Sequence, residues 1–124
     1  MQYPVVFNKQ PFDVFPNGLN AVYHANQWWF DLETIMKFVG YADNYVRSPL
    51  IILKRLKEGC CIRIKFGRKY SYFINFTGWL RLIAYGHVTA DDRVLSSYLS
   101  TKAFMSSVTD AEASIQGDRE VESV

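Results

Sequence analysis

The chain has few of the side chains that metal centres and redox sites are built from. It holds two cysteines, Cys60 and Cys61, and two histidines, His24 and His87, which stand far apart in the sequence. A structural zinc site needs four ligands at short spacings, so we expect no metal and no cofactor. Consecutive strand residues point to opposite faces, so we expect one buried and one partly exposed thiol rather than a disulfide between the two cysteines.

The sequence also lacks the arrangements of residues that support catalysis. No glycine-rich phosphate loop is present, because each glycine stands alone at a turn or at the end of a helix. Neither histidine lies in a motif that would pair it with a nucleophile. Asp91 and Asp92 are adjacent carboxylates, but in the first turn of a predicted helix they complement the helix dipole. We therefore expect that the protein is not an enzyme.

Long apolar runs and a leader segment are absent as well. The longest aliphatic run covers residues 50–53 and ends at Lys54, whereas a spanning helix needs about 18 apolar residues. The N-terminus has no basic segment followed by an apolar one, as a secretory signal would. These patterns predict no membrane contact and a place in the cytoplasm of the cell that makes the protein.

Apolar and aromatic side chains are plentiful. The 124 residues are 49% hydrophobic and 16% aromatic, which is enough for the packed core of one domain. The net charge of +2 is divided unevenly, since residues 1–106 carry +6 and residues 107–124 carry −4. That last segment is rich in serine and alanine and has no aromatic residue. The sequence predicts a globular domain over 1–106 and an acidic, disordered tail over 107–124.

An aromatic hairpin leading into a capped helix is the clearest local pattern. Strands over 19–24 and 27–30 are joined by two residues, and the second strand contains Trp28 and Trp29. These two indoles point to opposite faces, so one lies exposed unless a partner covers it, which makes both candidate protein-interaction residues. A helix over 32–39 follows, with Asp31 as its N-cap and Gly40 after its last turn.

The remaining elements alternate between short strands and short helices. A strand is expected over 3–7, followed by a loop over 8–18. Ser48 is expected to cap a helix that ends at Gly59, with either Leu50, Leu53 and Leu56 or the pair Ile52 and Leu56 on its core face. A hairpin over 60–75 follows. Thr77 and Thr89 are the expected caps of two further helices, the last ending near Ser106. The pattern predicts an α+β fold, a small single domain of antiparallel β-hairpins with interspersed helices.

The third helix and the second hairpin together form a run of basic residues. Seven of the sixteen residues from 54 to 69 are basic, and Glu58 is the one acid among them. Such a helix and ribbon of one sign suit a phosphate backbone, and Tyr70 or Tyr72 can add contacts. The alternative is an ordinary solvated surface. The four cations of the hairpin are expected close together on its wet side. The candidate DNA-binding residues are Lys54, Arg55, Lys57, Arg63, Lys65, Arg68 and Lys69.

Several short motifs resemble the Bro-N domain of viral Bro proteins and phage antirepressors. They are Trp29-Phe30 before the first helix, Val39-Gly40-Tyr41 at its end, the hairpin around 67–69, and the run Gly78-Trp79-Leu80-Arg81-Leu82-Ile83. The last helix, with Tyr98 near its centre, corresponds to the closing helix of that family. The similarity covers roughly residues 5–105. The chain departs from the family at 31–35, where Ala-x-Asp-Val is usual, and at Tyr98, where tryptophan is usual.

The resemblance implies a regulator of the phage or virus type. Such a regulator binds double-stranded DNA, or acts as an antirepressor that binds and inactivates a repressor or other host protein without contacting DNA. The second mode of action implies a homodimer or higher oligomer. The two hypotheses place the working surface differently, on the basic helix and hairpin for DNA and at Trp28 or Trp29 for a protein.

Overall fold

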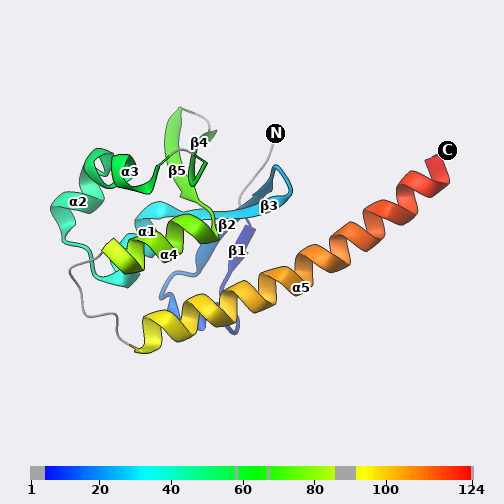
Figure 1. Cartoon of the computed structure of the whole chain (residues 1–124), viewed down its shortest axis with the longest axis horizontal. Helices are drawn as coiled ribbons and strands as arrows, with labels where there is room; N and C mark the ends of the chain where they lie inside the picture. The colour runs from blue at the N-terminus through cyan, green and yellow to red at the C-terminus, as the bar shows by residue number, and fades with distance from the viewer. Residues whose placement is uncertain (1–4, 58, 67, 86–91, 124) are drawn as a thin grey trace.

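The computed structural model describes residues 5–57, 59–66, 68–85 and 92–123, with the backbone alone for residue 66 and residues 109–123. Figure 1 shows a small sheet with helices packed against it, and one long helix that crosses the domain and extends beyond it. The strands form one antiparallel sheet in the order β1-β2-β3-β5-β4. They are β1 (Val5–Phe7), β2 (Leu19–His24), β3 (Gln27–Asp31), β4 (Cys61–Phe66) and β5 (Lys69–Ile74).

Short helices connect the strands, and the longest helix closes the described chain. In chain order they are the single 3-10 turn η1 (Phe12–Val14), α1 (Leu32–Val39), α2 (Asp43–Arg47), α3 (Leu50–Leu56), α4 (Phe76–Tyr85) and α5 (Asp92–Ser123). The predicted α+β class is confirmed. The structure does not describe the beginning of the expected strand over 3–7, and Glu58, Gly67, Gly86 and Thr89 also lie outside the described residues.

The β2–β3 hairpin and α1 form as the sequence predicts. Ala25 and Asn26 both have positive φ, 53° and 62°, as a tight hairpin turn requires. The Asp31 carboxylate accepts a hydrogen bond from the backbone N–H of Thr34, at 3.3 Å, and so caps α1. Gly40 closes the helix at φ 98°, a conformation that costs glycine little.

The main core lies between one face of the sheet and the helices α1, α4 and α5. Its largest buried side chain is Trp79, whose ring packs against Phe30 and Tyr98. Phe12 and Phe15, from the predicted loop, are buried in the same core. The other face carries a second, smaller cluster of Val22, Trp29 and Phe73, against which Ile62 and Ile64 pack. Both faces of the central strands are therefore apolar.

The structure corrects both ends of α3. Pro49 stands at its N-cap position without a side-chain cap, and Ser48 instead follows the last turn of α2. Lys57, at φ 64°, ends the helix before Gly59. Of the two predicted apolar faces, the one with Ile52 and Leu56 is buried, whereas Leu50 is 63% exposed. Both predicted faces include Leu56, so the spacing of the apolar residues does not decide which face is buried.

Asn75, rather than Thr77, caps α4. The Asn75 Oδ1 atom accepts the backbone N–H of Gly78 at 2.9 Å, and its Nδ2 atom donates to the Gly59 carbonyl at 3.0 Å. This cap lets α4 begin at Phe76. A Cβ atom on Gly78 would lie 2.9 Å from the Cys60 carbonyl oxygen, so only glycine lets the helix approach the hairpin this closely.

The last helix does not end near Ser106 but continues to Ser123 (Figure 1). Val108 still packs against the main core, and the backbone beyond it continues away from the domain. Extending a helix that already exists needs no new nucleus. The prediction of a disordered tail over 107–124 used composition alone and did not take this into account. No helix within the described residues is long and apolar enough to span a membrane, and this includes α5.

Candidate nucleic-acid interface

The outer part of the β4–β5 hairpin stands free of the other strands. β3 pairs with β5 at only two positions, Phe30 with Ile74 and Asp31 with Phe73, and then turns into α1. The pairing of β4 with β5 continues for four more positions, as far as Phe66 with Lys69. The segments 63–66 and 69–72 therefore form a two-stranded ribbon, which rises above the domain in Figure 1.

One face of this ribbon joins two cations to a tyrosine ring. Arg63 lies opposite Tyr72 and Lys65 lies opposite Tyr70, so all four side chains leave the ribbon on the same face. The Arg63 Cζ atom is 4.4 Å from the centroid of the Tyr70 ring, and the Lys65 Nζ atom is 5.5 Å from it. Such cation–π contacts are worth roughly 0.5–1 kcal/mol at exposed sites. They hold two positive charges beside a ring that is 50% exposed.

The other predicted cations of the hairpin take different positions. Lys69 precedes Tyr70 in β5, so its side chain leaves the ribbon on the face opposite to Arg63 and Lys65. Arg68 is exposed at the tip. The expectation that all four cations share one wet side is therefore wrong for Lys69. The sequence does not fix the length of the turn to within one residue, and a shift of one residue moves a side chain to the other face. The sequence therefore does not determine which face carries Lys69.

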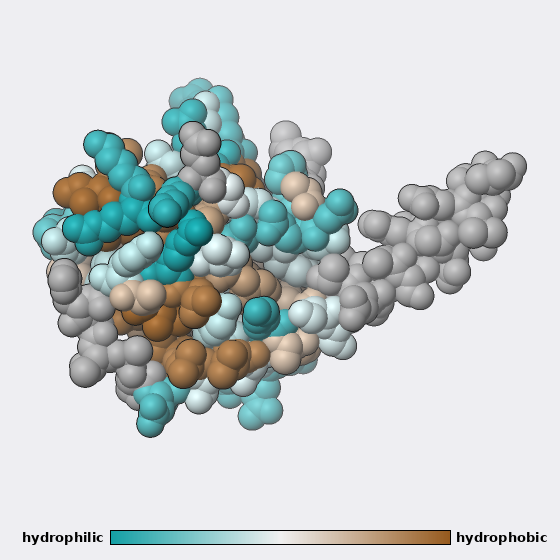
Figure 2. All heavy atoms as spheres, viewed as in Figure 1, coloured by the Kyte–Doolittle hydropathy of each residue, from teal (hydrophilic) through white to brown (hydrophobic). Residues whose placement is uncertain are grey.

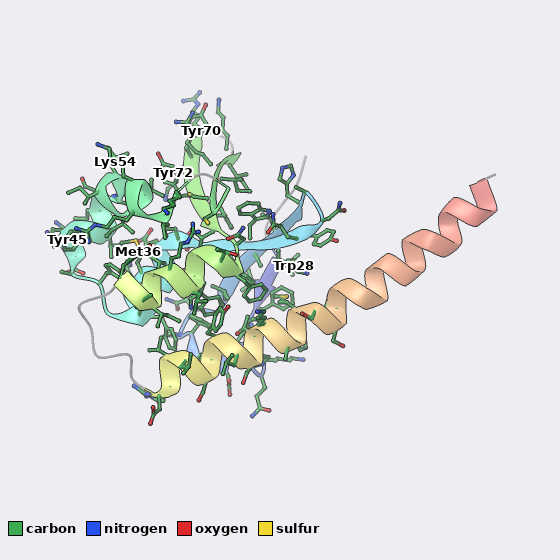
Figure 3. All side chains as sticks on the ribbon, viewed as in Figure 1. Trp28, Met36, Tyr45, Lys54, Tyr70 and Tyr72 are labelled. Atoms are coloured by element: carbon green, nitrogen blue, oxygen red, sulfur yellow. The ribbon has the colours of Figure 1, made fainter. Side chains whose placement is uncertain are left out.

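Helix α3 contributes further exposed cations. Lys54 and Arg55 are exposed in its last turn, and Lys57 is exposed just after it. Figure 3 shows Lys54 on the outward side of α3, at the same end of the molecule as Tyr70. Arg55 lies close to Tyr41, where burial raises the pKa of the phenol and the guanidinium charge partly opposes that shift. The Tyr41 hydroxyl donates to the Leu82 carbonyl at 2.9 Å.

The charges of this surface are not neutralised within the described part of the chain. None of the seven predicted DNA-binding residues forms an ion pair there. Figure 2 shows hydrophilic side chains covering the outer end of the hairpin and extending over α3. An anionic partner would therefore meet positive charge at Arg63, Lys65 and Lys54 that no described residue pairs with.

Neither of the two candidate protein-interaction residues is exposed. Trp28 is 6% exposed and packs in the main core, where its ring contacts Phe7 and Tyr23. Trp29 is 3% exposed and belongs to the second cluster, and its Nε1 atom donates to the His24 carbonyl at 2.8 Å. The expectation that the indoles point to opposite faces is confirmed. The expectation that one is exposed is wrong, because β3 is an interior strand with an apolar cluster on each face.

The base of the hairpin is tied to α3 and α4 by a residue that sequence reasoning missed. The Arg81 Nη1 atom donates to the Leu56 carbonyl at 2.5 Å and lies 2.8 Å from the Cys60 sulfur. It thereby satisfies a backbone carbonyl at the end of α3 and fixes that end beside the start of β4. In the sequence Arg81 is one cation in an apolar helix, with no local sign of this role.

The cysteines take the predicted environments, one buried and one partly exposed, and both are free. Burial is the main cause that raises the pKa of the Cys61 thiol to about 11, so the thiol stays protonated at neutral pH. Within the described residues no group of three or more His, Cys, Asp or Glu side chains is arranged to hold a metal ion. His24 is exposed at the end of β2, and His87 lies outside the described residues.

A separate apolar patch lies on the outer side of α4 and α5. Leu80, Leu95 and Leu99 are 45%, 44% and 55% exposed. The two helices are in contact, and Figure 2 shows apolar side chains across both. Large apolar side chains that share a surface are typical of protein-binding sites.

Comparison with models of protein families, with curated proteins and with solved structures gave no significant match. The resemblance to the Bro-N domain therefore stays a prediction.

Proposed function

We propose that this domain is a DNA-binding regulator of the phage or virus type, without enzymatic activity, that acts in the cytoplasm of a host cell. The free ribbon of β4–β5 and the adjacent end of α3 form its contact surface for double-stranded DNA. The observation that carries the proposal is the pair Arg63 and Lys65, oriented on one ribbon face by the exposed Tyr70 ring and without an ion-pair partner among the described residues.

The shape of the surface supports duplex DNA as the ligand. The major groove of B-DNA is about 12 Å wide and admits a two-stranded ribbon, whose strands lie about 5 Å apart. The free ribbon has this form, and in this proposal the exposed cations Lys54 and Arg55 of α3 contact the flanking phosphates. We expect Lys69, on the opposite ribbon face, to contribute less to DNA binding.

Salt dependence of binding tests the proposal. Each phosphate that a cation neutralises adds about 0.9 to the slope of log affinity against log salt. We expect Arg63→Ala with Lys65→Ala to weaken duplex binding about tenfold and to lower that slope by about 1.8. The measurement is fluorescence anisotropy of a labelled duplex at several salt concentrations.

The matched control changes Lys9 and Lys102 to alanine, which removes the same charge from elsewhere. Lys9 follows the opposite edge strand β1, and Lys102 lies on α5. We expect its affinity to stay within about twofold of the wild type. The proposal fails if the wild type shows no duplex binding at low salt, or if the control loses as much affinity as the test variant.

A second candidate function is supported by the apolar patch of Leu80, Leu95 and Leu99. In this alternative the chain is an antirepressor-like protein that binds a repressor or other host protein, as a homodimer or higher oligomer, without contacting DNA. Leu95→Ser with Leu99→Ser separates the two candidates, since it should abolish a protein contact and leave duplex affinity unchanged. Pull-down from host lysate and light scattering of both proteins give the readout.

A further inference from the structure

A groove runs along the part of the β5 edge, residues 69–72, that no described strand covers. Its volume is about 200 Å³, and four consecutive residues of β5, from Lys69 to Tyr72, line it. Consecutive strand residues point to opposite faces of a sheet. Four consecutive residues can therefore line one groove only through the backbone edge that they share. The edge is open because β3 leaves the sheet at Asp31, where α1 begins. Its polar backbone groups are a template for another strand.

The opposite wall of the groove is provided by the helices. Met36 of α1, Val46 of α2 and Pro49 before α3 line it together with the β5 edge. Figure 3 shows Met36 and Tyr72 on this side of the domain, between α1 and the hairpin. A segment lying along β5 would therefore place alternate side chains against Val46 and Pro49, and such contacts give strand addition its specificity.

Among the charged lining residues without an ion pair to a described residue, two are cations and one is an acid. Among the acids, the Asp31 carboxylate accepts the Thr34 hydroxyl at 2.6 Å and Glu33 pairs with Lys37 at 3.0 Å. Arg47 and Lys69 also line the groove, and neither forms an ion pair with a described residue. An acidic side chain beside these two cations would be favourable, and the unpaired acid, Asp31, already accepts two hydrogen bonds from Thr34.

From these three observations we propose that the β5 edge is a binding site for an extended acidic peptide segment of a partner protein. The segment adds to β5 as a further strand and places its carboxylates near Arg47 and Lys69. Pairing of two copies through the same edge would set Lys69 opposite Tyr72 and would give the cations no acidic partner from the added strand. The site uses the β5 edge and Arg47, whereas the proposed DNA surface uses the ribbon face of Arg63 and Lys65; Lys69 and Tyr70 take part in both.

Arg47 is the residue that this site adds to the sequence predictions. It stands in the last turn of α2, outside the basic run over 54–69, and no motif surrounds it in the sequence. Arg47 and Lys69 line the same groove because α2 lies beside the β5 edge in the folded domain. A local sequence pattern therefore gives no sign of its role.

The test uses the full chain and a labelled peptide of alternating glutamate and valine. We expect Arg47→Gln and Lys69→Gln each to weaken its binding at least about fivefold, and Arg47→Glu with Lys69→Glu to weaken it at least about fiftyfold. Lys54→Gln, which removes an exposed cation outside the groove, is the matched control and should stay within about twofold. Circular dichroism of each variant verifies that it is folded.

A second probe distinguishes strand addition from simple charge attraction. The same peptide with alternate backbone nitrogens methylated keeps its charge but loses the N–H donors that a strand needs. We expect it not to bind, and we expect the unmodified peptide to slow amide hydrogen exchange at residues 69–72. Arg63→Ala with Lys65→Ala should leave peptide affinity unchanged, so loss of DNA binding and loss of peptide binding are separate results.

Three outcomes would overturn the proposal. The alternating peptide does not bind the wild type, the methylated peptide binds equally well, or the Lys54→Gln control weakens binding as much as Arg47→Gln. Displacement of the peptide by duplex DNA, together with weaker DNA binding in Arg47→Gln, would likewise overturn it by assigning the groove to the DNA surface.

Discussion

The two hairpins of this domain share a topology but differ in what surrounds them. β2–β3 lies inside the sheet, with β1 on one side and β5 on the other, and carries buried apolar side chains on both faces. β4–β5 is covered by β3 for only two positions and then continues alone. The first hairpin is therefore part of the core, whereas the second presents cations and an exposed tyrosine to solvent.

This contrast originates at Asp31, whose helix cap leaves the ribbon uncovered. Asp31 ends β3 and starts α1 in one step, because its carboxylate caps the helix while its backbone still pairs with Phe73. If β3 continued for four more residues, it would cover Lys69–Tyr72 and close the groove. A single capping residue thus creates both the free ribbon and the open edge beside it.

Stability should separate the two hairpins most clearly. Trp29→Ala should lower the free energy of unfolding by about 3–5 kcal/mol, because it empties a buried site and removes the hydrogen bond to the His24 carbonyl. Tyr70→Ala should cost about 1 kcal/mol or less, since it loses an exposed ring and its cation contacts. Urea denaturation measures both. Equal losses would contradict the contrast between a core hairpin and a free one.

A smaller effect is expected at the base of the second hairpin, where Cys61 is partly buried. Burial raises the pKa of its thiol from about 9 to about 11, so at pH 8 the folded protein should hold roughly 100-fold less thiolate than the unfolded chain. Alkylation of Cys61 by iodoacetamide should be slower by about that factor and should rise with pH up to about 11. Fragment-ion mass spectrometry distinguishes Cys61 from Cys60.

The direction of the Cys61 pKa shift also makes the stability of the fold depend on pH. Because the folded pKa is raised, the contribution of the protonated thiol is fully present below pH 9 and is lost as the pH rises towards 11. An alkylation rate that levels off near pH 9 would show instead that the base of the hairpin is as open as its tip.

Much of the fold could be predicted from the sequence because local chemistry determines it. The turn at Ala25 and Asn26, the cap at Asp31 and the glycine at Gly40 all act within a few residues, and each was predicted. The alternation of residues 61–66 likewise identified β4. The cap of α4 was missed because Asn75, Thr77 and Gly78 lie close together, and packing against the hairpin decided between the two capping residues.

The surface was harder to predict because it depends on distant parts of the chain. Which cations share a face follows from the register of β4 with β5, and the burial of Trp28 and Trp29 follows from β3 lying inside the sheet. Arg47 and Arg81 take their places only when α2 and α4 pack beside the hairpin. No local pattern carries such information.

DNA binding by the free ribbon is tested most directly by mapping the contact residue by residue. Backbone and side-chain NMR shifts of the labelled protein would be followed as a short duplex is added at low salt. We predict that the largest changes fall on Arg63, Lys65 and Tyr70, with smaller ones on Lys54 and Arg55. Changes centred on the β2–β3 turn or on α5, with the ribbon unaffected, would contradict DNA binding by the free ribbon.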